Sequence, residues 1–414
     1  MQEHYSKNQP TSAHIVIVGG GMVGISLALM LARQLPSVAI SLIEQRLISL
    51  LEEPPHYQAS FDERSTALSA GSQSIFHSLG CWSEIEPHVQ AINTIHVSDK
   101  GHFAGLQLNA LDYTLPALGY VIENRRLGQV LLQQLKETAV NFVNPGQVSQ
   151  CQACKGGYQL LVRDHEQEQQ LTADLVIIAD GSESPLRQSL GIDITTRDYH
   201  QLAMIANVEL SEAHRGVAYE RFTDDGPIAL LPLPDLRNAQ QRTHRAALVW
   251  TFPSAKQSSI DTLDASALCL LLQQRFGYRA GSIKHIGQRH YYPLKLVQAE
   301  EQIRSHLAIV GNAAHFLHPV AGQGFNLALR DCQQLVQCVS KAPATRLGCY
   351  QHLKTYLDKQ VFDQHATIAI TDRLVTLFSS QRASFTITRQ LGLLGLNTLP
   401  LFKTAFANRM MGIQ

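Results

Sequence analysis

Three glycines near the start of the chain have the spacing of a phosphate-binding loop. Gly19, Gly21 and Gly24 form a Gly-x-Gly-x-x-Gly pattern, and Glu44 follows 20 residues after the last of them. The first glycine of this pattern allows a tight turn, the second lets the backbone approach a diphosphate, and the third lets a helix pack closely on a strand. A carboxylate at Glu44 can accept hydrogen bonds from a ribose diol and disfavours a 2′-phosphate. The pattern therefore predicts a cofactor that contains adenosine, FAD or NAD rather than NADP.

Two further polar clusters each come directly after an apolar run. The first is Asp180-Gly181, which on its own indicates no more than a turn. The second begins at Gly311-Asn312 and continues into a loop rich in glycine and polar side chains, which contains His315, Gly322, Gln323, Gly324 and Asn326. Such a loop lets the backbone approach a planar ligand, and the N-terminus of a following helix favours negative charge. We therefore expect this loop to bind a ligand.

The apolar runs define the elements that must position these residues. Residues 14–18 and 38–43 read as buried strands, and the helix between them extends to about Gln34, which predicts a βαβ unit. Residues 13–32 carry no Lys, Arg, Asp or Glu, as in a membrane span or signal peptide, but three consecutive glycines interrupt the run. We predict an α/β fold (α+β overall), with a Rossmann-like domain of βαβ type.

The predicted domains are interleaved along the chain. Residues 1–75, 100–190 and 290–340 are expected to form the cofactor-binding domain. Residues 76–99 and 191–289 are expected to form a substrate domain with an antiparallel sheet, because strands at 202–210 and 246–252 flank turn signals. Residues 341–414 read as a C-terminal helical region.

Composition narrows the class of protein. The 34 basic residues balance the 34 acidic ones, so a nucleic-acid partner is not expected. Charged residues make up only 16% of the chain, against about 25% in typical proteins, which hints at an apolar partner. Seven irregularly spaced cysteines fit a reducing cytosol better than a disulfide framework. We predict no metal site, since Cys151 and Cys154 lack a second pair and are interpreted as part of a polar loop.

The three motifs together resemble those of the flavoprotein aromatic hydroxylases related to para-hydroxybenzoate hydroxylase. The resemblance spans about residues 14–375 and includes a Gly-Asp box in which Asn312 replaces the usual Asp. Segment 62–69 also resembles the wider family, and four segments resemble the hydroxylases of ubiquinone biosynthesis within it: 96–101, 121–124, 219–233 and 321–326.

The resemblance implies a cofactor, a reaction and a set of site residues. It implies an FAD-dependent monooxygenase that uses NADH or NADPH as reductant and O2 as co-substrate, and hydroxylates a polyprenylated phenol through a flavin C4a-hydroperoxide. Gly19, Gly21 and Gly24 would hold the FAD diphosphate, and Glu44 the adenosine ribose. The other residues implied near FAD are Arg64, Gln129, Asp180, Gly181, Asn312, Gly322, Gln323, Gly324 and Asn326. His315 is the single catalytic candidate.

Two alternative functions stay open at this point. One is a non-catalytic FAD-binding subunit of a biosynthetic complex, and the other is a related flavin-dependent lipid reductase. The uncharged stretch 390–402 has 13 residues, too few to cross a bilayer. One interpretation is an amphipathic helix docked on the body of the protein. The other is that residues 390–414 contact a membrane surface or a ubiquinone-biosynthesis complex. The expected location is the cytoplasm, with peripheral association with the inner membrane.

Overall fold

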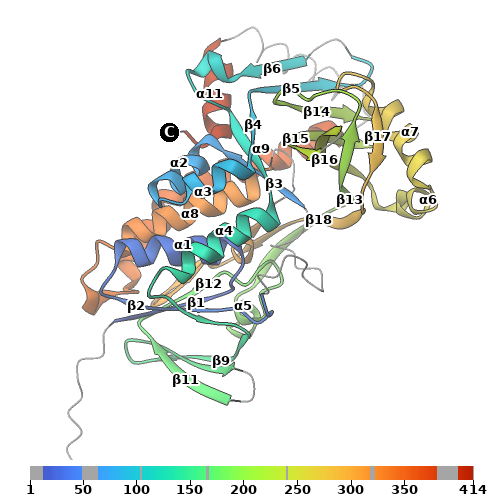
Figure 1. Cartoon of the computed structure of the whole chain (residues 1–414). Helices are drawn as coiled ribbons and strands as arrows, with labels where there is room; N and C mark the ends of the chain where they lie inside the picture. The colour runs from blue at the N-terminus through green and yellow to red at the C-terminus, as the bar shows by residue number, and fades with distance from the viewer. Residues whose placement is uncertain are drawn as a thin grey trace, which may run out of the picture.

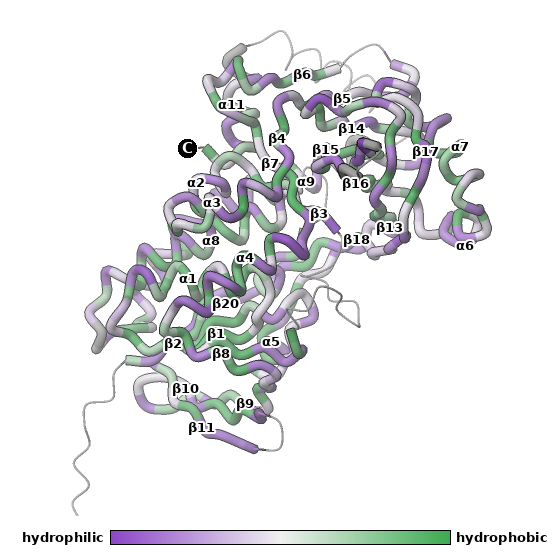
Figure 2. The backbone as a smooth tube through the Cα atoms, in the orientation of Figure 1, coloured by the Kyte–Doolittle hydropathy of each residue, from purple (hydrophilic) through white to green (hydrophobic). Residues whose placement is uncertain are grey.

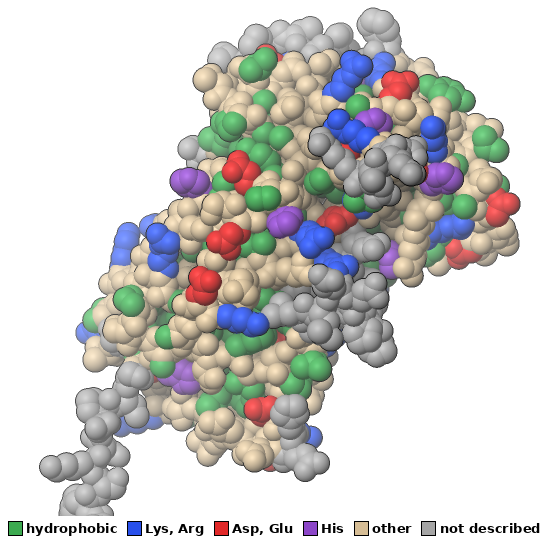
Figure 3. All heavy atoms as spheres, in the orientation of Figure 1, with side chains coloured by type: hydrophobic (Ala, Val, Ile, Leu, Met, Phe, Trp, Pro, Cys, Tyr) green, Lys and Arg blue, Asp and Glu red, His purple; other side chains and the backbone are tan. Residues whose placement is uncertain are grey.

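The computed structural model describes residues 13–48, 64–102, 105–164, 167–238, 241–317, 322–379 and 400–413. Figure 1 shows two lobes, one of which stacks helices on a parallel sheet while the other surrounds a large twisted sheet. Figure 3 shows Lys and Arg side chains, in blue, near the junction of the two lobes.

The first lobe is centred on a six-stranded sheet with the order β19-β20-β12-β1-β2-β8. Its strands are β1 (His14–Val18), β2 (Ala39–Ile43), β8 (Asn141–Val143), β12 (Leu175–Ile178), β19 (Ile303–Arg304) and β20 (Leu307–Ile309). All neighbouring pairs are parallel except β19 and β20. Parallel strands are covered on both faces, which explains why their sequences are continuous apolar runs. The predicted βαβ unit is confirmed, with α1 (Met22–Gln34) between β1 and β2.

Alternate residues of β1 face two different cores. Ile15 and Ile17 pack under α1, α4 (Asn124–Lys136) and α8 (Gln323–Val339), whereas Val16 and Val18 pack against a three-stranded sheet. That second layer comprises β9 (Gly146–Cys154), β10 (Gly157–Asp164) and β11 (Gln167–Ala173). Figure 2 shows the hydrophobic residues along the central strands and the hydrophilic outer strand β11. Cys151 and Cys154 lie on β9, so the prediction of a polar loop there is wrong.

The second lobe is built on a large, mostly antiparallel sheet. Its strands are β5 (Thr94–Asp99), β6 (Gly105–Asn109), β13 (Ile194–Leu210), β14 (Val217–Thr223), β15 (Gly226–Asn238), β16 (Gln241–Pro253), β17 (Ile283–Ile286), β18 (His290–Ala299) and β21 (His315–Phe316). The short helices α6 (Gln257–Asp261) and α7 (Ala265–Phe276) cover its outer face (Figure 1). Both β6 and β18 belong to this sheet, so the predicted boundaries at residues 100 and 290 cut across it.

A small sheet and several helices join the lobes. The sheet comprises β3 (Ser65–Ser69), β7 (Gly119–Glu123) and β4 (Gln90–Ile92), and β15 contacts both β4 and β7. The helices α2 (Ala70–Ser78), α3 (Trp82–Ile85), α5 (Pro185–Ser189), α9 (Tyr350–Ser379) and α11 (Pro400–Met411) complete the fold. α11 docks on the body through Ala407 and Met411, which are buried beside the small sheet. Within the described ranges, no helix combines the length and apolar character needed to cross a bilayer.

Candidate cofactor-binding site

The three motifs predicted from the sequence meet at one edge of the parallel sheet. Val18, Ile178 and Ile309 end neighbouring strands, and backbone bonds from Ala179 N to Val18 O (2.7 Å) and from Val310 N to Ile178 O (2.9 Å) continue the ladder beyond them. This is the carboxyl edge of the sheet, where ligands bind in open α/β folds. The sheet thus brings together residues that are about 290 positions apart in the chain.

The glycine-rich loop is packed too tightly for side chains at two of its positions. Gly19 has a φ of +112°, and a Cβ there would lie only 2.7 Å from Asp180 N. A Cβ at Gly24 would overlap the carbonyl oxygen of Gly19. Gly21 directly precedes α1, and no side chain caps the helix start. The first N–H groups of α1 are therefore available to an anionic ligand.

The side chain of Glu44 links this loop to the residues that follow β2. Its Oε2 accepts a hydrogen bond from Gly20 N at 2.7 Å, and its Oε1 accepts one from Arg46 N at 2.7 Å. The side chain is half-buried. Each carboxylate oxygen has a second lone pair, so Glu44 can hold a ribose hydroxyl while it fixes the loop.

Asp180 has an unsatisfied buried oxygen. Its Oδ2 accepts a hydrogen bond from Leu186 N at 3.4 Å, while Oδ1 is buried without a partner among the described residues. Burial raises the pKa of this carboxyl, and hydrogen bonds from Ser184 and Leu186 oppose the rise. The next residue, Gly181, has a φ of +95°, and a Cβ there would meet nothing within 4 Å. The Asp-Gly turn thus combines a buried acceptor that has no partner among the described residues with backbone at Gly181 that borders open space.

Arg187 joins the second motif to the third, a role that the sequence did not indicate. Its buried guanidinium donates from Nη1 to Ala313 O at 2.7 Å and from Nη2 to Ser182 O at 3.0 Å. In the sequence, Arg187 is visible only as a basic residue in the helix that follows the Asp-Gly turn, because burial of its guanidinium depends on the tertiary structure. Arg187 therefore fixes the spacing between the Asp-Gly turn and the Gly311-Asn312 turn.

In the third motif the backbone at Gly322 and Gly324 is partly exposed, whereas Gly311 is buried. Gly311 has a φ of +63° and packs on Val23 of α1, while the side chain of Asn312 is exposed. Gly322 has a φ of +59° and precedes α8, and a Cβ at Gly324 would meet nothing within 4 Å. Helix α8 begins at Gln323, within the predicted ligand loop.

Both polar atoms of the Asn326 side chain form hydrogen bonds inside the protein. Its Oδ1 accepts hydrogen bonds from Ser69 N (2.9 Å) and Ser72 Oγ (2.7 Å). Its Nδ2 donates to Ala67 O and Gly322 O, both at 2.8 Å. Gln323 is also buried, and its Nε2 donates to Met410 O of α11 at 3.1 Å. These two side chains hold the start of α8 in place, which leaves the backbone of the loop as the part that can contact a ligand.

Arg64 and Gln129 lie on other elements. The Arg64 guanidinium sits 4.8 Å from the ring centroid of Tyr292 on β18, which places it at the junction of the lobes. Gln129 is on α4, where its Oε1 accepts a hydrogen bond from Arg126 at 3.3 Å.

His315 points into the core. It is 1% exposed and its Nε2 pairs with Asp331 of α8, which is itself completely buried. The Asp331 Oδ1 accepts a further bond from Gln364 Nε2 of α9 at 3.0 Å. This geometry suits a residue that ties β21 to α8 and argues against the prediction that His315 acts on the substrate.

Comparisons with known proteins agree with this geometry. The family model described as an FAD binding domain matches residues 12–364. The chain is 34% identical over 404 residues to the ubiquinone hydroxylase UbiL of Rhodospirillum rubrum, covering 97% of this chain and 90% of that protein. It is 30% identical over 411 residues to the 3-demethoxyubiquinol 3-hydroxylase of Escherichia coli, covering 98% and 100%. The chain belongs to the FAD-binding family of flavoprotein monooxygenases.

Solved structures support the same fold for this monooxygenase. The p-nitrophenol 4-monooxygenase of Pseudomonas putida superimposes with a TM-score of 0.73 at 14% identity, covering 97% of this chain and 98% of that one. A variant of Klebsiella pneumoniae HpxO, solved with FAD, gives 0.74 at 15% identity, covering 96% and 99%. The predictions of family, FAD and enzyme class are thereby confirmed, with NAD(P)H and O2 as the family's other reactants.

The site of this monooxygenase fits FAD. An elongated dinucleotide needs backbone donors for its diphosphate and acceptors for its hydroxyl groups. The uncapped start of α1 offers the donors, and Asp180 Oδ1, which has no partner among the described residues, offers an acceptor. Gly181 and Gly324 border open space where a side chain would intrude on a ligand.

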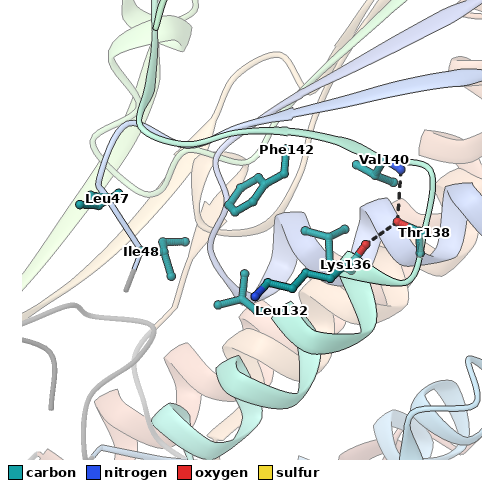
Figure 4. A pocket seen from close by; sticks show the side chains of 8 residues that line it. Leu47, Ile48, Leu132, Lys136, Thr138, Val140 and Phe142 are labelled. Carbon is teal, nitrogen blue, oxygen red and sulfur yellow. Dashed lines mark hydrogen bonds between the residues drawn. The ribbon is translucent and has the colours of Figure 1, made fainter. Parts of the chain in front are cut away.

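An apolar pocket adjoins the Glu44 side of this site. Figure 4 shows it between the C-terminal half of α4 and β8, with the side chains of Leu47, Leu132 and Phe142 around it. It has a volume of about 540 Å³. Ile48, which lines the pocket, donates from its backbone to Asn144 Oδ1 at 2.9 Å, and Asn144 Nδ2 donates to Glu44 O at 3.1 Å. The pocket therefore lies on the adenosine side of the predicted FAD site, away from the junction of the lobes.

Proposed function

We propose that this monooxygenase hydroxylates the aromatic ring of a polyprenylated phenol in ubiquinone biosynthesis. The supporting observation is its likeness, along nearly the whole chain, to two proteins named as ubiquinone-pathway hydroxylases. Bound FAD supplies the redox chemistry that couples NAD(P)H oxidation to the insertion of one oxygen atom of O2 into the ring.

The residues of the chain bind and orient. The Gly19–Gly24 loop and the start of α1 would hold the diphosphate, and Glu44 the adenosine ribose. Asp180 and the exposed amide of Asn312 would hold hydroxyl groups of the ribityl chain. The backbone around Gly322 and Gly324 would border the isoalloxazine, with Arg64 at the lobe junction. Gln129 would contact FAD from α4.

The decisive experiment combines a spectrum with turnover. The purified protein should be yellow, and NADH or NADPH should bleach its flavin in the absence of O2. With O2 and a short-chain 2-prenyl-6-methoxyphenol, the product should gain one oxygen atom by mass spectrometry. A flavin that binds but never reduces would favour a non-catalytic subunit. Reduction followed by hydrogenation of the prenyl chain would favour a lipid reductase.

The ring position needs a direct comparison of substrates. The Escherichia coli relative is named for 3-demethoxyubiquinol, whereas the segments that carry the resemblance, together with Asn312, most resemble those of a 2-polyprenyl-6-methoxyphenol hydroxylase. We therefore propose the methoxyphenol as substrate. Its kcat/KM should exceed that of a short-chain demethoxyubiquinol at least tenfold, and the reverse ranking would reassign the ring position.

A lipid-facing contact within residues 390–414 is part of this proposal. The apolar stretch 390–399 lies outside the described residues, whereas α11 is docked on the core. Deleting the whole segment would uncover that core, so paired substitutions Leu393→Glu and Leu394→Glu are the better test. Liposome association should fall while FAD content stays constant, and unchanged association would refute the contact.

A further inference from the structure

One carboxylate on the inner face of the large sheet, that of Glu220, has no partner in the part of the chain that the structure describes. Glu220 lies on β14, where neighbouring side chains alternate between the two faces of the sheet. Tyr219 packs on Phe276 of α7 with its ring centroid 5.9 Å away, so it faces outward. Ala218 packs in the cluster that contains Ala407 and Met411 of α11, so it faces inward. Glu220 shares the face of Ala218 and points toward the small sheet and the cofactor-binding lobe.

The strand register places Glu220 in a row of side chains that are only partly covered. We call this row the inner row; it crosses the sheet as Val97, Glu220, Ala229, Val249, Ile205 and His290, all half-buried. The residues behind it, such as Leu230 and Leu248, are at most 1% exposed under α7. Ala218 and Ala247, one step along the same inner face, are buried beside α11. The inner row is therefore the part of this face that the described elements leave accessible.

A chain of contacts connects the inner row to the third motif. Gly322 lies against Ala67 of β3, because a Cβ there would come within 3.2 Å of that side chain. Ala67 pairs with Val121 of β7, and Val121 shares a buried cluster with Ala218 and Ala247. The inner row thus lies across the small sheet from the loop that borders the isoalloxazine in the proposed function.

The Glu220 carboxylate stands alone in this setting. Among the described residues it makes no hydrogen bond or ion pair, and burial alone raises its pKa from 4.5 to about 7. The charged groups nearby on this face are engaged: Arg245 pairs with Glu123 at 2.6 Å, and Asp99 pairs with His102 at 3.2 Å. Arg64 lies over Tyr292, and His290 ends the inner row four strands from Glu220. A half-buried carboxylate loses part of its hydration without gaining a partner, so a ligand group that donates a hydrogen bond to Glu220 would be favoured there.

We propose that Glu220 is a catalytic residue that binds the substrate's phenol hydroxyl and takes its proton. In this step the phenol O–H bond breaks, a carboxyl O–H bond forms on Glu220, and the electron pair stays on the phenolate oxygen. The phenolate ring is richer in electrons, which favours attack by an electrophilic oxygen. The apolar neighbours Val97, Ala229 and Val249 suit an aromatic ring beside the carboxylate. This assignment rests on the proposed function.

A pair of ligands tests the contact without turnover. One is 2-methoxy-6-(3-methylbut-2-enyl)phenol, and the other is its O-methyl ether, which cannot donate a hydrogen bond. Binding to the FAD-loaded protein is measured without reductant, from the perturbation of the flavin spectrum. At pH 8 the phenol should bind about tenfold or more tightly than the ether, because a hydrogen bond to a carboxylate is strong.

The variants decide the role of Glu220. In Glu220→Gln the preference for the phenol should fall to about twofold, whereas the exposed control Glu212→Gln should keep it. In single-turnover hydroxylation, the wild-type rate should rise with pH near 7, and Glu220→Gln should lose that limb without a change in flavin reduction. Full preference for the phenol in a folded, FAD-loaded Glu220→Gln would overturn the assignment.

A measurement on the unaltered protein guards against a variant that fails to fold. The wild-type preference for the phenol should increase between pH 5.5 and 8.5 as the carboxylate ionises, and a flat profile would also overturn the assignment. If neither ligand binds to the wild-type protein, the proposed substrate class fails instead. The two failures are therefore distinguishable.

Discussion

Gly324 offers a test in which stability and cofactor binding move in opposite directions. It is the second residue of α8, and a Cβ there would meet no protein atom within 4 Å. Alanine in a helix is favoured over glycine by roughly 0.5–1 kcal/mol. Gly324→Ala should therefore raise the free energy of unfolding of the apoprotein by about that amount.

The same methyl group should weaken FAD binding. In the proposed site the backbone at Gly324 borders the isoalloxazine, so a Cβ occupies space that the ring system needs. A displacement that costs about 1.4 kcal/mol would raise the Kd of FAD tenfold. We expect a loss of tenfold or more, measured by titrating the apoprotein and following the quenching of flavin fluorescence. Urea denaturation of the apoprotein supplies the stability.

A control in the same helix isolates the effect of position. Gln337 lies near the C-terminal end of α8 and is exposed, so Gln337→Ala should change helix propensity slightly and leave FAD binding unchanged. Two results would refute the reasoning. An apoprotein destabilised by Gly324→Ala would mean that the position is not open, and wild-type affinity for FAD would mean that the cofactor does not approach this backbone.

Four further predictions follow from single contacts. Gly24→Ala should lower the free energy of unfolding by roughly 2 kcal/mol or more, since its Cβ would overlap Gly19 O; urea denaturation would show it, and an unchanged midpoint would contradict it. Arg187→Met leaves two buried carbonyls without donors and should cost about 2–4 kcal/mol and reduce the FAD content on purification; full FAD content would argue against its role between the two turns. Asn326→Ala removes four hydrogen bonds and should cost about 3 kcal/mol, seen as a lower Tm; a loss below about 1 kcal/mol would show that the start of α8 is held by other contacts. Glu220→Gln should be more stable than the wild type by about 1–3 kcal/mol above pH 7 and equally stable below pH 4.5. The reason is that the pKa of Glu220 is raised from 4.5 to about 7 in the folded protein, so the unfolded chain releases this proton at a lower pH and the wild type loses stability as pH rises between these values. A stability difference that does not change with pH would contradict this prediction.

Local sequence was sufficient for the scaffold of the cofactor site. The β-branched run 14–18, the glycines after it and the helix formers beyond them each prefer the conformation that they adopt, so β1, its turn and α1 were predictable. The same held for the strands before Asp180 and Gly311. Membership of the flavoprotein hydroxylases followed from these motifs, because their spacing reflects a shared way of binding one cofactor.

The boundaries between the domains were not predictable in the same way. The large sheet recruits β6 and β18 from segments that the sequence pattern grouped with the other lobe. A strand's own residues specify that it is extended and which face is apolar, but its partner is chosen by long-range hydrogen bonding and packing. The assignment of Cys151 and Cys154 to a polar loop failed for the same reason, since their strand β9 is held by pairing with β10.

What the sequence by itself determined is the βαβ frame, the positions of the three motifs and the cofactor that such motifs bind. Only the tertiary structure decided which polar side chains form hydrogen bonds inside the protein and which remain available to bind a ligand. His315 and Asn326 stand in a predicted ligand loop, yet His315 Nε2 pairs with Asp331 and Asn326 Oδ1 accepts a hydrogen bond from Ser69 N. Glu220 lies in a segment that the sequence marks only by its resemblance to the family, whereas strand pairing places it on the partly covered face of the large sheet. The physical reason is that burial and hydrogen-bond satisfaction depend on residues far away in the chain, whereas backbone preference depends on near neighbours.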